Sequence, residues 1–228
     1  MTLVALGDSD TTGLGDSTGQ GWVGHAMLVQ QRLGLRVGVT NLAADGKTSE
    51  QLLNDVQSDP TTQRDLRSAQ IVLLGIGGAD LNPGDENLQA GRCKGQACYQ
   101  PLLRQFDRNF GATVAAVRRL VARSTLIRAI SLPNGYPGAG DAFPSFVTGD
   151  VALYQATTER KTVCDAMRNG AGKCIDVVRA FNGPKGTGDA YKAGLMTKDP
   201  CCYPSADGQQ LMARLLYGQG LGSLKESG

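Results

Sequence analysis

Ser9 is the residue of this chain best placed for covalent chemistry. It follows Gly7 and Asp8 at the end of the apolar run 3–6, and residues 10–21 are almost all small or polar. A short apolar run is typical of a buried strand, and open α/β sheets bind ligands at the carboxyl ends of such strands. A serine hydroxyl there can attack a carbonyl carbon, while backbone N–H groups at a glycine turn can bind the resulting oxyanion. The alternative is a Gly-Asp-Ser turn that only closes the strand.

The elements that must position Ser9 alternate between strand and helix. Apolar runs predict five strands, at residues 3–6, 36–42, 71–74, 126–132 and 174–178. Helical periodicity predicts the helices, at residues 22–33, 48–56, 101–123, 149–167 and 209–217. Thr48 and Gln51 form a capping-box pattern for the second helix, Asp59-Pro60 ends it, and Ser205 caps the last helix. With no repeat or linker, the chain is predicted to be one parallel-sheet α/β domain over residues 1–228.

Three stretches lack a regular pattern. We expect residues 81–100 to form an insertion stapled by a disulfide between Cys93 and Cys98, which close a short loop. Residues 133–146 form a Gly/Pro-containing loop long enough to shape a binding mouth. Residues 179–204 are expected to be irregular up to the cap of the last helix.

The other four cysteines are Cys164, Cys174, Cys201 and Cys202. Adjacent cysteines rarely pair with each other, so we expect Cys201 or Cys202 to reach back to Cys164 or Cys174. The chain lacks the Cys-x-x-Cys pairs and neighbouring histidines of a zinc site, so no metal is expected. Six cysteines favour an exported, oxidised protein.

Composition limits the classes of partner. The formal net charge of +2 gives no electrostatic case for nucleic acid. No apolar run approaches the roughly 20 residues that a membrane span needs. The amino terminus lacks the basic start and the length of a secretory signal. We therefore expect a secreted or otherwise extracytoplasmic monomer, with its signal peptide absent from this sequence, that binds a small molecule.

Four blocks along the chain resemble the signature blocks of the GDSL family, the SGNH hydrolases. They are residues 7–10 (Gly-Asp-Ser-Asp), 41–46, 77–80 (Gly-Gly-Ala-Asp) and 201–208, and each follows a predicted strand or precedes a predicted helix in the family's order. The resemblance covers essentially the whole chain. It implies a flavodoxin-like three-layer α/β/α sandwich with a five-stranded parallel sheet, serine ester hydrolysis, and neither a metal nor an organic cofactor.

The resemblance also implies roles for individual residues. Ser9 is the nucleophile, and Gly46 supplies a backbone N–H to the oxyanion hole. Ala79 stands where the family has an asparagine oxyanion donor, and Tyr203 stands where it has the histidine base. Asp199 lies four residues before Tyr203, one further than the family's orienting aspartate. It is a candidate to orient a partner or to act as a weak base, and an ordinary exposed loop aspartate is the alternative.

These departures leave two functions open. The only histidine, His25, is on the first predicted helix and is interpreted as an ordinary helix residue. A tyrosine, with an unperturbed pKa near 10, is a poor base at neutral pH, and the loss of one oxyanion donor typically costs about 10²–10³ in turnover. The first function is hydrolysis of lipid, small-alcohol or carbohydrate esters through Ser9. The second is a catalytically silent or repurposed protein of the same fold that binds a small ligand or carbohydrate.

Four aspartates are expected near the mouth of this site: Asp8, Asp10, Asp45 and Asp80. Acidic clusters can hold a cation or bond sugar hydroxyls. The alternative is that these side chains are solvated loop ends and helix caps.

Overall fold

A five-stranded parallel sheet forms the centre of the computed structural model, which describes all residues except 33, 35, 171 and 220–228. The strand order is β2-β1-β3-β4-β5. The strands are β1 Thr2–Gly7, β2 Gly38–Asn41, β3 Ile71–Gly75, β4 Leu126–Ile130 and β5 Lys173–Ile175. This order confirms the flavodoxin-like parallel sheet predicted from the sequence.

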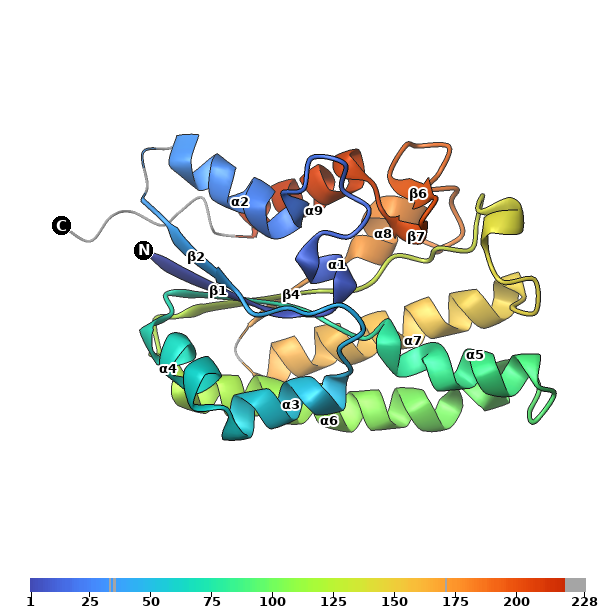
Figure 1. The fold of residues 1–228 in the computed structure, drawn as a ribbon, viewed down its shortest axis with the longest axis horizontal. Helices are drawn as coiled ribbons and strands as arrows, with labels where there is room; N and C mark the ends of the chain where they lie inside the picture. Colours follow the sequence, from blue (N-terminus) through green and yellow to red (C-terminus); the bar gives the residue numbers. More distant parts are fainter. Residues whose placement is uncertain (33, 35, 171, 220–228) are drawn as a thin grey trace.

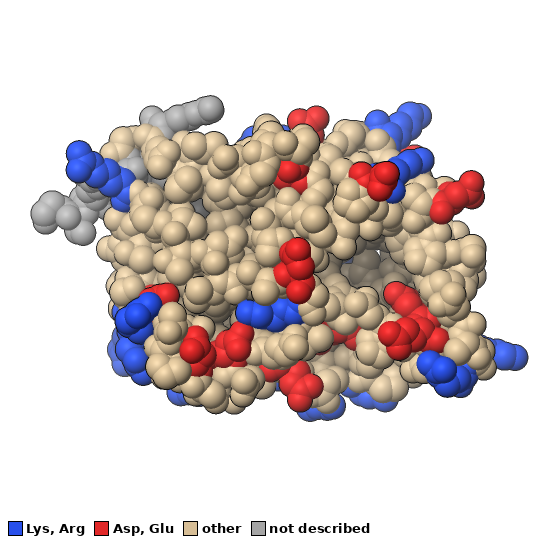
Figure 2. Space-filling view, in the orientation of Figure 1, with Lys and Arg blue, Asp and Glu red and all other residues tan. Residues whose placement is uncertain are grey.

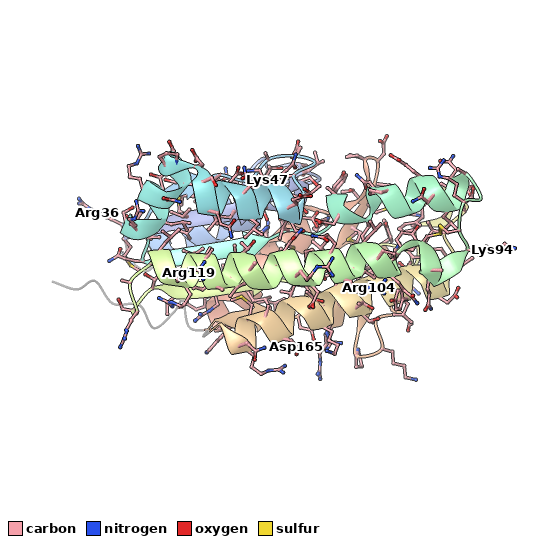
Figure 3. The ribbon with its side chains drawn as sticks, turned by 90° about the horizontal axis from the view of Figure 1, so that it is seen from below. Arg36, Lys47, Lys94, Arg104, Arg119 and Asp165 are labelled. Atoms are coloured by element: carbon pink, nitrogen blue, oxygen red, sulfur yellow. A yellow bond between two sulfur atoms is a disulfide. The ribbon has the colours of Figure 1, made fainter. Side chains whose placement is uncertain are left out.

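Helices cover both faces of the sheet (Figure 1). One face carries α2 Gly21–Arg32, α8 Val177–Asn182 and α9 Ala206–Gly218. The other carries α3 Ser49–Ser58, α4 Pro60–Ser68, α6 Gln100–Leu120 and α7 Gly149–Asn169. Figure 3 shows this second layer from below, with α6 and α7 side by side and with Arg104 and Arg119 on the outer side of α6.

The alternation of side chains along β1 builds two separate cores. Leu3 and Ala5 point into the cluster under α2 and α9, whereas Val4 and Leu6 point into the cluster under α3, α6 and α7. All four side chains are at most 1% exposed. A strand buried on both faces has no polar side to alternate with, which is why its sequence is a continuous apolar run.

The predicted helix ends are mostly confirmed. The Thr48 side chain and the Gln51 side chain make the reciprocal capping box, and Ser205 accepts the backbone N–H of Gly208 at the start of α9. Asp59-Pro60 does more than end α3, because the Asp59 carboxylate caps α4, a helix that the sequence analysis did not predict. The last residue of the predicted helix 22–33 lies outside the described residues.

Residues 81–100 are more regular than predicted. They contain α5 Asn82–Gln89 and a 3₁₀ turn at Gly95–Cys98. Pro83 is tolerated because it lies in the first turn of α5, where a backbone N–H has no helical acceptor. The predicted Cys93–Cys98 disulfide is confirmed.

The predicted pairing of the remaining cysteines is wrong. Cys164 of α7 pairs with Cys174 of β5, because α7 packs beside β5 and brings the two Cα atoms within 4.8 Å. Cys201 pairs with its neighbour Cys202. These two lie on β7 Cys201–Pro204, which forms an antiparallel pair with β6 Met196–Lys198, so the stretch 179–204 is not irregular throughout.

Among the described residues, no helix combines the length and the apolar character needed to cross a membrane.

Candidate active site

A cavity of about 470 Å³ lies where the carboxyl ends of the strands meet α5, α7 and β7. Figure 2 shows the hollow right of centre, with acidic side chains below and to the right of it. Four of the five predicted site residues line it: Ser9, Gly46, Ala79 and Tyr203. Asp199 is exposed in the turn between β6 and β7 and does not line this cavity.

Ser9 begins α1 Ser9–Thr12, directly after β1 and Asp8. Residue 7 must be a glycine because its backbone packs closely against β3, and a Cβ on residue 7 would overlap the carbonyl oxygen of Gly75. The first N–H groups of a helix have no helical acceptor. The Ser9 N–H is therefore free to face a ligand, and it donates to no other described residue.

Gly46 lies in the turn after β2 with φ +72°, a conformation that favours glycine. Within the described part of the chain its N–H donates to no acceptor. Ala79, in the loop after β3, also lines the cavity, and its methyl group cannot donate a hydrogen bond. The backbone N–H groups of Ser9 and Gly46, two residues that line the cavity, have no acceptor within the described part of the chain.

The Asp8 carboxylate connects the loops that carry these groups. One oxygen accepts the N–H groups of Gly77 and Gly78, at 2.9 and 3.1 Å, and the other accepts the N–H of Asp10 at 3.2 Å. Asp8 is 2% exposed. Burial raises the pKa of Asp8 to about 6 in spite of the three N–H donors. Through these three hydrogen bonds, Asp8 holds the start of α1, which carries Ser9, against the loop that follows β3.

Tyr203, at the position of the family's histidine, lines the same cavity as Ser9, whose side chain influences the pKa of the Tyr203 phenol, but no hydrogen bond between the two side chains is present among the described residues. The backbone of Gly15 packs closely against Tyr203, and a Cβ on residue 15 would lie 2.7 Å from the Tyr203 Cβ. Burial and the nearby charge of Asp10 raise the pKa of Tyr203, although the Ser9 side chain opposes the shift. Tyr203 is therefore a neutral phenol at neutral pH and cannot act alone as a base.

Asp10 is a carboxyl group without donors. It lines the cavity and accepts no hydrogen bond from the described residues. Burial and the charge of Asp8 raise the pKa of Asp10 well above its usual value. A carboxylate whose pKa is raised toward neutrality is a stronger base than an ordinary aspartate.

Glu159 is a site residue that the sequence analysis missed. It projects from α7 into the cavity wall and is 2% exposed. Its Oε2 accepts the N–H of Leu132 at 3.1 Å, but its Oε1 has no partner among the described residues. Burial and the charges of Asp8 and Asp10 raise the pKa of Glu159. The sequence contained a signal, because Glu159 lies at helical spacing from Ala156 and Val163 on the buried face of α7.

The other acidic residues predicted at the mouth are separated by the structure. Asp45 lines the cavity and accepts the Thr12 hydroxyl at 2.7 Å. Asp80 does not line the cavity and instead accepts the backbone N–H and the hydroxyl of Ser49, at 2.9 and 2.5 Å. Asp80 therefore joins the loop after β3 to the start of α3.

His25 is far from the reacting serine. Its Nε2 lies 3.0 Å from the buried Asp16 carboxylate, and it does not line the cavity. Asp16 in turn accepts the backbone N–H groups of Thr18 and Gly21, both at 2.8 Å. The interpretation of His25 as an ordinary helix residue therefore agrees with its position. Among the described residues, no group of three or more His, Cys, Asp or Glu side chains is arranged to hold a metal ion.

Comparison with known proteins gives one family match. The model of a family described as GDSL-like Lipase/Acylhydrolase matches residues 5–211. A protein of Bacillus subtilis (strain 168), described as "Uncharacterized protein YpmR", is 35% identical over 83 residues. That match covers 36% of this chain and about a third, 32%, of the relative.

Solved structures show the same fold at low identity. The lipase Lip_vut3 from a goat rumen metagenome has a TM-score of 0.79 and 20% identity, covering 99% of this chain and 100% of that one. An extracellular lipase from Streptomyces rimosus has a TM-score of 0.67 and 14% identity, covering 96% and 99%. Phospholipase A1 from Streptomyces albidoflavus NA297 has a TM-score of 0.64 and 16% identity, covering 96% and 98%.

Proposed function

The chain belongs to the GDSL-like Lipase/Acylhydrolase family, and from this premise we propose that it hydrolyses carboxylic esters with Ser9 as the nucleophile. The observation that carries the proposal is the placement of Ser9 at the cavity floor, beside free N–H groups on Ser9 and Gly46. Serine acylation needs a nucleophilic hydroxyl and donors for the oxyanion, and these residues supply both.

The reaction proceeds in two acyl transfers. The Ser9 Oγ attacks the ester carbonyl carbon, and the Ser9 and Gly46 N–H groups bind the oxyanion that forms. The carbonyl re-forms as the bond to the alkoxy oxygen breaks, which leaves acyl-Ser9 and an alcohol that takes up the serine proton. Water then attacks acyl-Ser9, releases the carboxylic acid and returns the proton to Ser9.

The proton of Ser9 needs an acceptor other than histidine. A phenol can accept and donate a hydrogen bond at the same time, and Tyr203 lines the same cavity as Ser9. Among the charges acting on Tyr203, that of Asp10 is the strongest. We propose that bound substrate brings the Tyr203 hydroxyl between Ser9 and Asp10, so that Tyr203 passes the serine proton toward the Asp10 carboxylate in place of the histidine–aspartate pair. In the structure itself, no hydrogen bond joins these three side chains among the described residues. The exposed Asp199 has no part in this route.

The site is expected to be slow. Ala79 removes one oxyanion donor, a loss that typically costs about 10²–10³ in turnover. The three disulfides support an extracytoplasmic location for this activity.

The test is the reaction of the protein with a fluorophosphonate probe, followed by intact mass. We expect one adduct on the wild type, none on Ser9→Ala, and slower labelling of Tyr203→Phe and Asp10→Asn. Both conservative variants keep the shape of the side chain and remove only its proton-transfer group. No adduct on folded wild-type protein would contradict the proposal.

The second candidate function is ligand binding without turnover. Ala79 and Tyr203, which stand in place of the family's asparagine and histidine, favour it. The double variant Ala79→Asn with Tyr203→His separates the two functions. If it hydrolyses p-nitrophenyl acetate and the wild type neither hydrolyses this ester nor takes up the probe, the native site is a binding pocket.

A further inference from the structure

The cavity at Ser9 is lined by acids and by no base. Five carboxyl groups contribute to its wall: Asp8, Asp10, Asp45, Asp85 and Glu159. None of the described residues that line it is a lysine, arginine or histidine. The labelled basic side chains of Figure 3, among them Lys94, Arg104 and Arg119, belong to the outer surface. The carboxyl groups of the cavity therefore have no basic partner among the described residues of its wall.

Three of the five carboxyl groups have protein donors. Asp8 accepts three backbone N–H groups, Asp45 accepts the Thr12 hydroxyl, and Asp85 accepts the Tyr99 hydroxyl. The hydrogen-bonding capacity of these three carboxyl groups is therefore used, at least in part, by donors within the protein. Glu159 differs, because its Oε1 is buried without a partner among the described residues, and the half-buried Asp10 accepts no hydrogen bond from them.

Of these last two carboxyl groups, Glu159 is more deeply buried than Asp10. The residue lines the cavity but is only 2% exposed, and its Oε1 is buried without a hydrogen-bond partner among the described residues. Leaving a buried carboxyl oxygen without a hydrogen-bond partner is costly, so such a group indicates a donor that the chain does not supply. A ligand in the cavity is the available source of that donor.

We propose that the cavity binds the protonated amine of its substrate, with the ammonium group donating to Glu159 Oε1 and lying in the field of Asp10. The inference names the substrate class of the site, and its catalytic part therefore rests on the proposed function. The substrate is a small carboxylic ester with an alkylammonium group, whose carbonyl carbon reaches Ser9 in the same cavity.

The chemistry of the wall favours an alkylammonium ion over other cations and over a neutral hydroxyl. A quaternary ammonium ion has no N–H and would leave Glu159 Oε1 unsatisfied. A hydroxyl group could donate, but it carries no positive charge with which to stabilise the ionised forms of Asp10 and Glu159, which burial disfavours. Leu132, Val147 and Ala156 supply an apolar wall for the alkyl part of the substrate. A charge-assisted hydrogen bond in such surroundings is about twice as strong as a neutral one.

The first experiment measures binding without catalysis. Hexan-1-amine, a cation at pH 7, is compared with hexan-1-ol and with hexanoate by titration calorimetry. We expect the amine to bind at least about tenfold more tightly than the alcohol, and hexanoate to bind least, as the strength of a hydrogen bond to a charged group requires. Equal binding of amine and alcohol overturns the inference.

The variants Glu159→Gln and Glu86→Gln form a matched pair. Both change a glutamate to glutamine and remove one negative charge, but Glu86 is exposed on α5 and does not line the cavity. In Glu159→Gln the new amide keeps an acceptor for the Leu132 N–H and presents its N–H₂ group where Oε1 stood. We expect the amine to lose about tenfold or more in affinity for Glu159→Gln and less than twofold for Glu86→Gln. Similar losses in both variants would overturn the inference.

The second experiment compares ethyl 6-aminohexanoate with ethyl heptanoate, which has the same number of heavy atoms. The inference predicts a lower KM for the amino ester in the wild type and loss of this preference in Glu159→Gln. If both esters are hydrolysed with the same KM, the inference fails and the proposed function stands. If neither ester is hydrolysed but hexan-1-amine binds through Glu159, the proposed function fails and the binding inference stands.

Discussion

The Asp8 carboxylate at the end of β1 accepts the N–H of Gly77, 2.9 Å away in the loop after β3. A second N–H, that of Gly78, donates to the same oxygen. These bonds fix the position of Ser9, the residue after Asp8, relative to the loop that follows β3. They do so through a buried group whose pKa is raised to about 6 because burial disfavours its charged form.

This relationship predicts how stability depends on pH. Since the folded-state pKa of Asp8 is above the ordinary value of 3.8, its contribution is fully present below about pH 4 and is lost as pH rises through 6. The variant Asp8→Asn does not titrate. Measured by urea unfolding, its free energy of unfolding relative to wild type is expected to rise between pH 4 and 7, by up to about 3 kcal/mol. The exposed control Asp141→Asn should show no such change, and a constant difference for Asp8→Asn would refute the prediction.

Gly15 is predicted to position Tyr203. Gly15 and Gly19 both have positive φ, +89° and +69°, so alanine strains either site by about 1 kcal/mol. Only at Gly15 does the new Cβ meet other atoms, those of Tyr203 and Pro204; at Gly19 no atom lies within 4 Å. Gly15→Ala should slow fluorophosphonate labelling of Ser9 by about 10–100-fold, as a shift of the proton-transfer group by a fraction of an ångström requires. Gly19→Ala should label at the wild-type rate.

His25 is predicted to stabilise the loop before α2 without taking part in catalysis. Its Nε2 lies against Asp16, whose pKa is lowered because hydrogen bonds from Thr18, Gly21 and His25 outweigh the opposite effect of burial. His25→Gln should lower the free energy of unfolding by about 1 kcal/mol. It should leave the labelling rate within about twofold of wild type, whereas Tyr203→Phe slows it. Loss of labelling in His25→Gln would instead identify His25 as the base.

The three disulfides are predicted to differ in their contribution to stability. Chain-entropy arguments give about 2 kcal/mol for the loop closed by Cys93–Cys98 and about 3 kcal/mol for Cys164–Cys174, because the sequence separations are 5 and 10. Cys201–Cys202 closes almost no loop and should contribute least. Replacing each pair by alanine and measuring urea unfolding checks this order. A larger loss for the adjacent pair than for Cys164–Cys174 would contradict it.

The sheet and its helices could be predicted from the sequence for a local reason. A strand buried on both faces, such as β1, needs a continuous apolar run, and a helix such as α6 needs an apolar stripe. Caps such as Thr48 and Ser205 also act within a few residues, so their effects are visible in the chain itself. The placement of Ser9 followed from the same local logic, because it directly succeeds a buried strand.

The partners of the site depended on contacts between distant segments. Tyr203 and Ser9 line one cavity although they are distant in the sequence. Cys164 pairs with Cys174 because α7 packs beside β5, and the Glu159 Oε1 has no partner among the described residues. No local pattern specifies which side chains α7 and β7 bring to the end of β1. Only the tertiary structure decided that, because packing fixes both the neighbours of each carboxyl group and the burial that shifts its pKa.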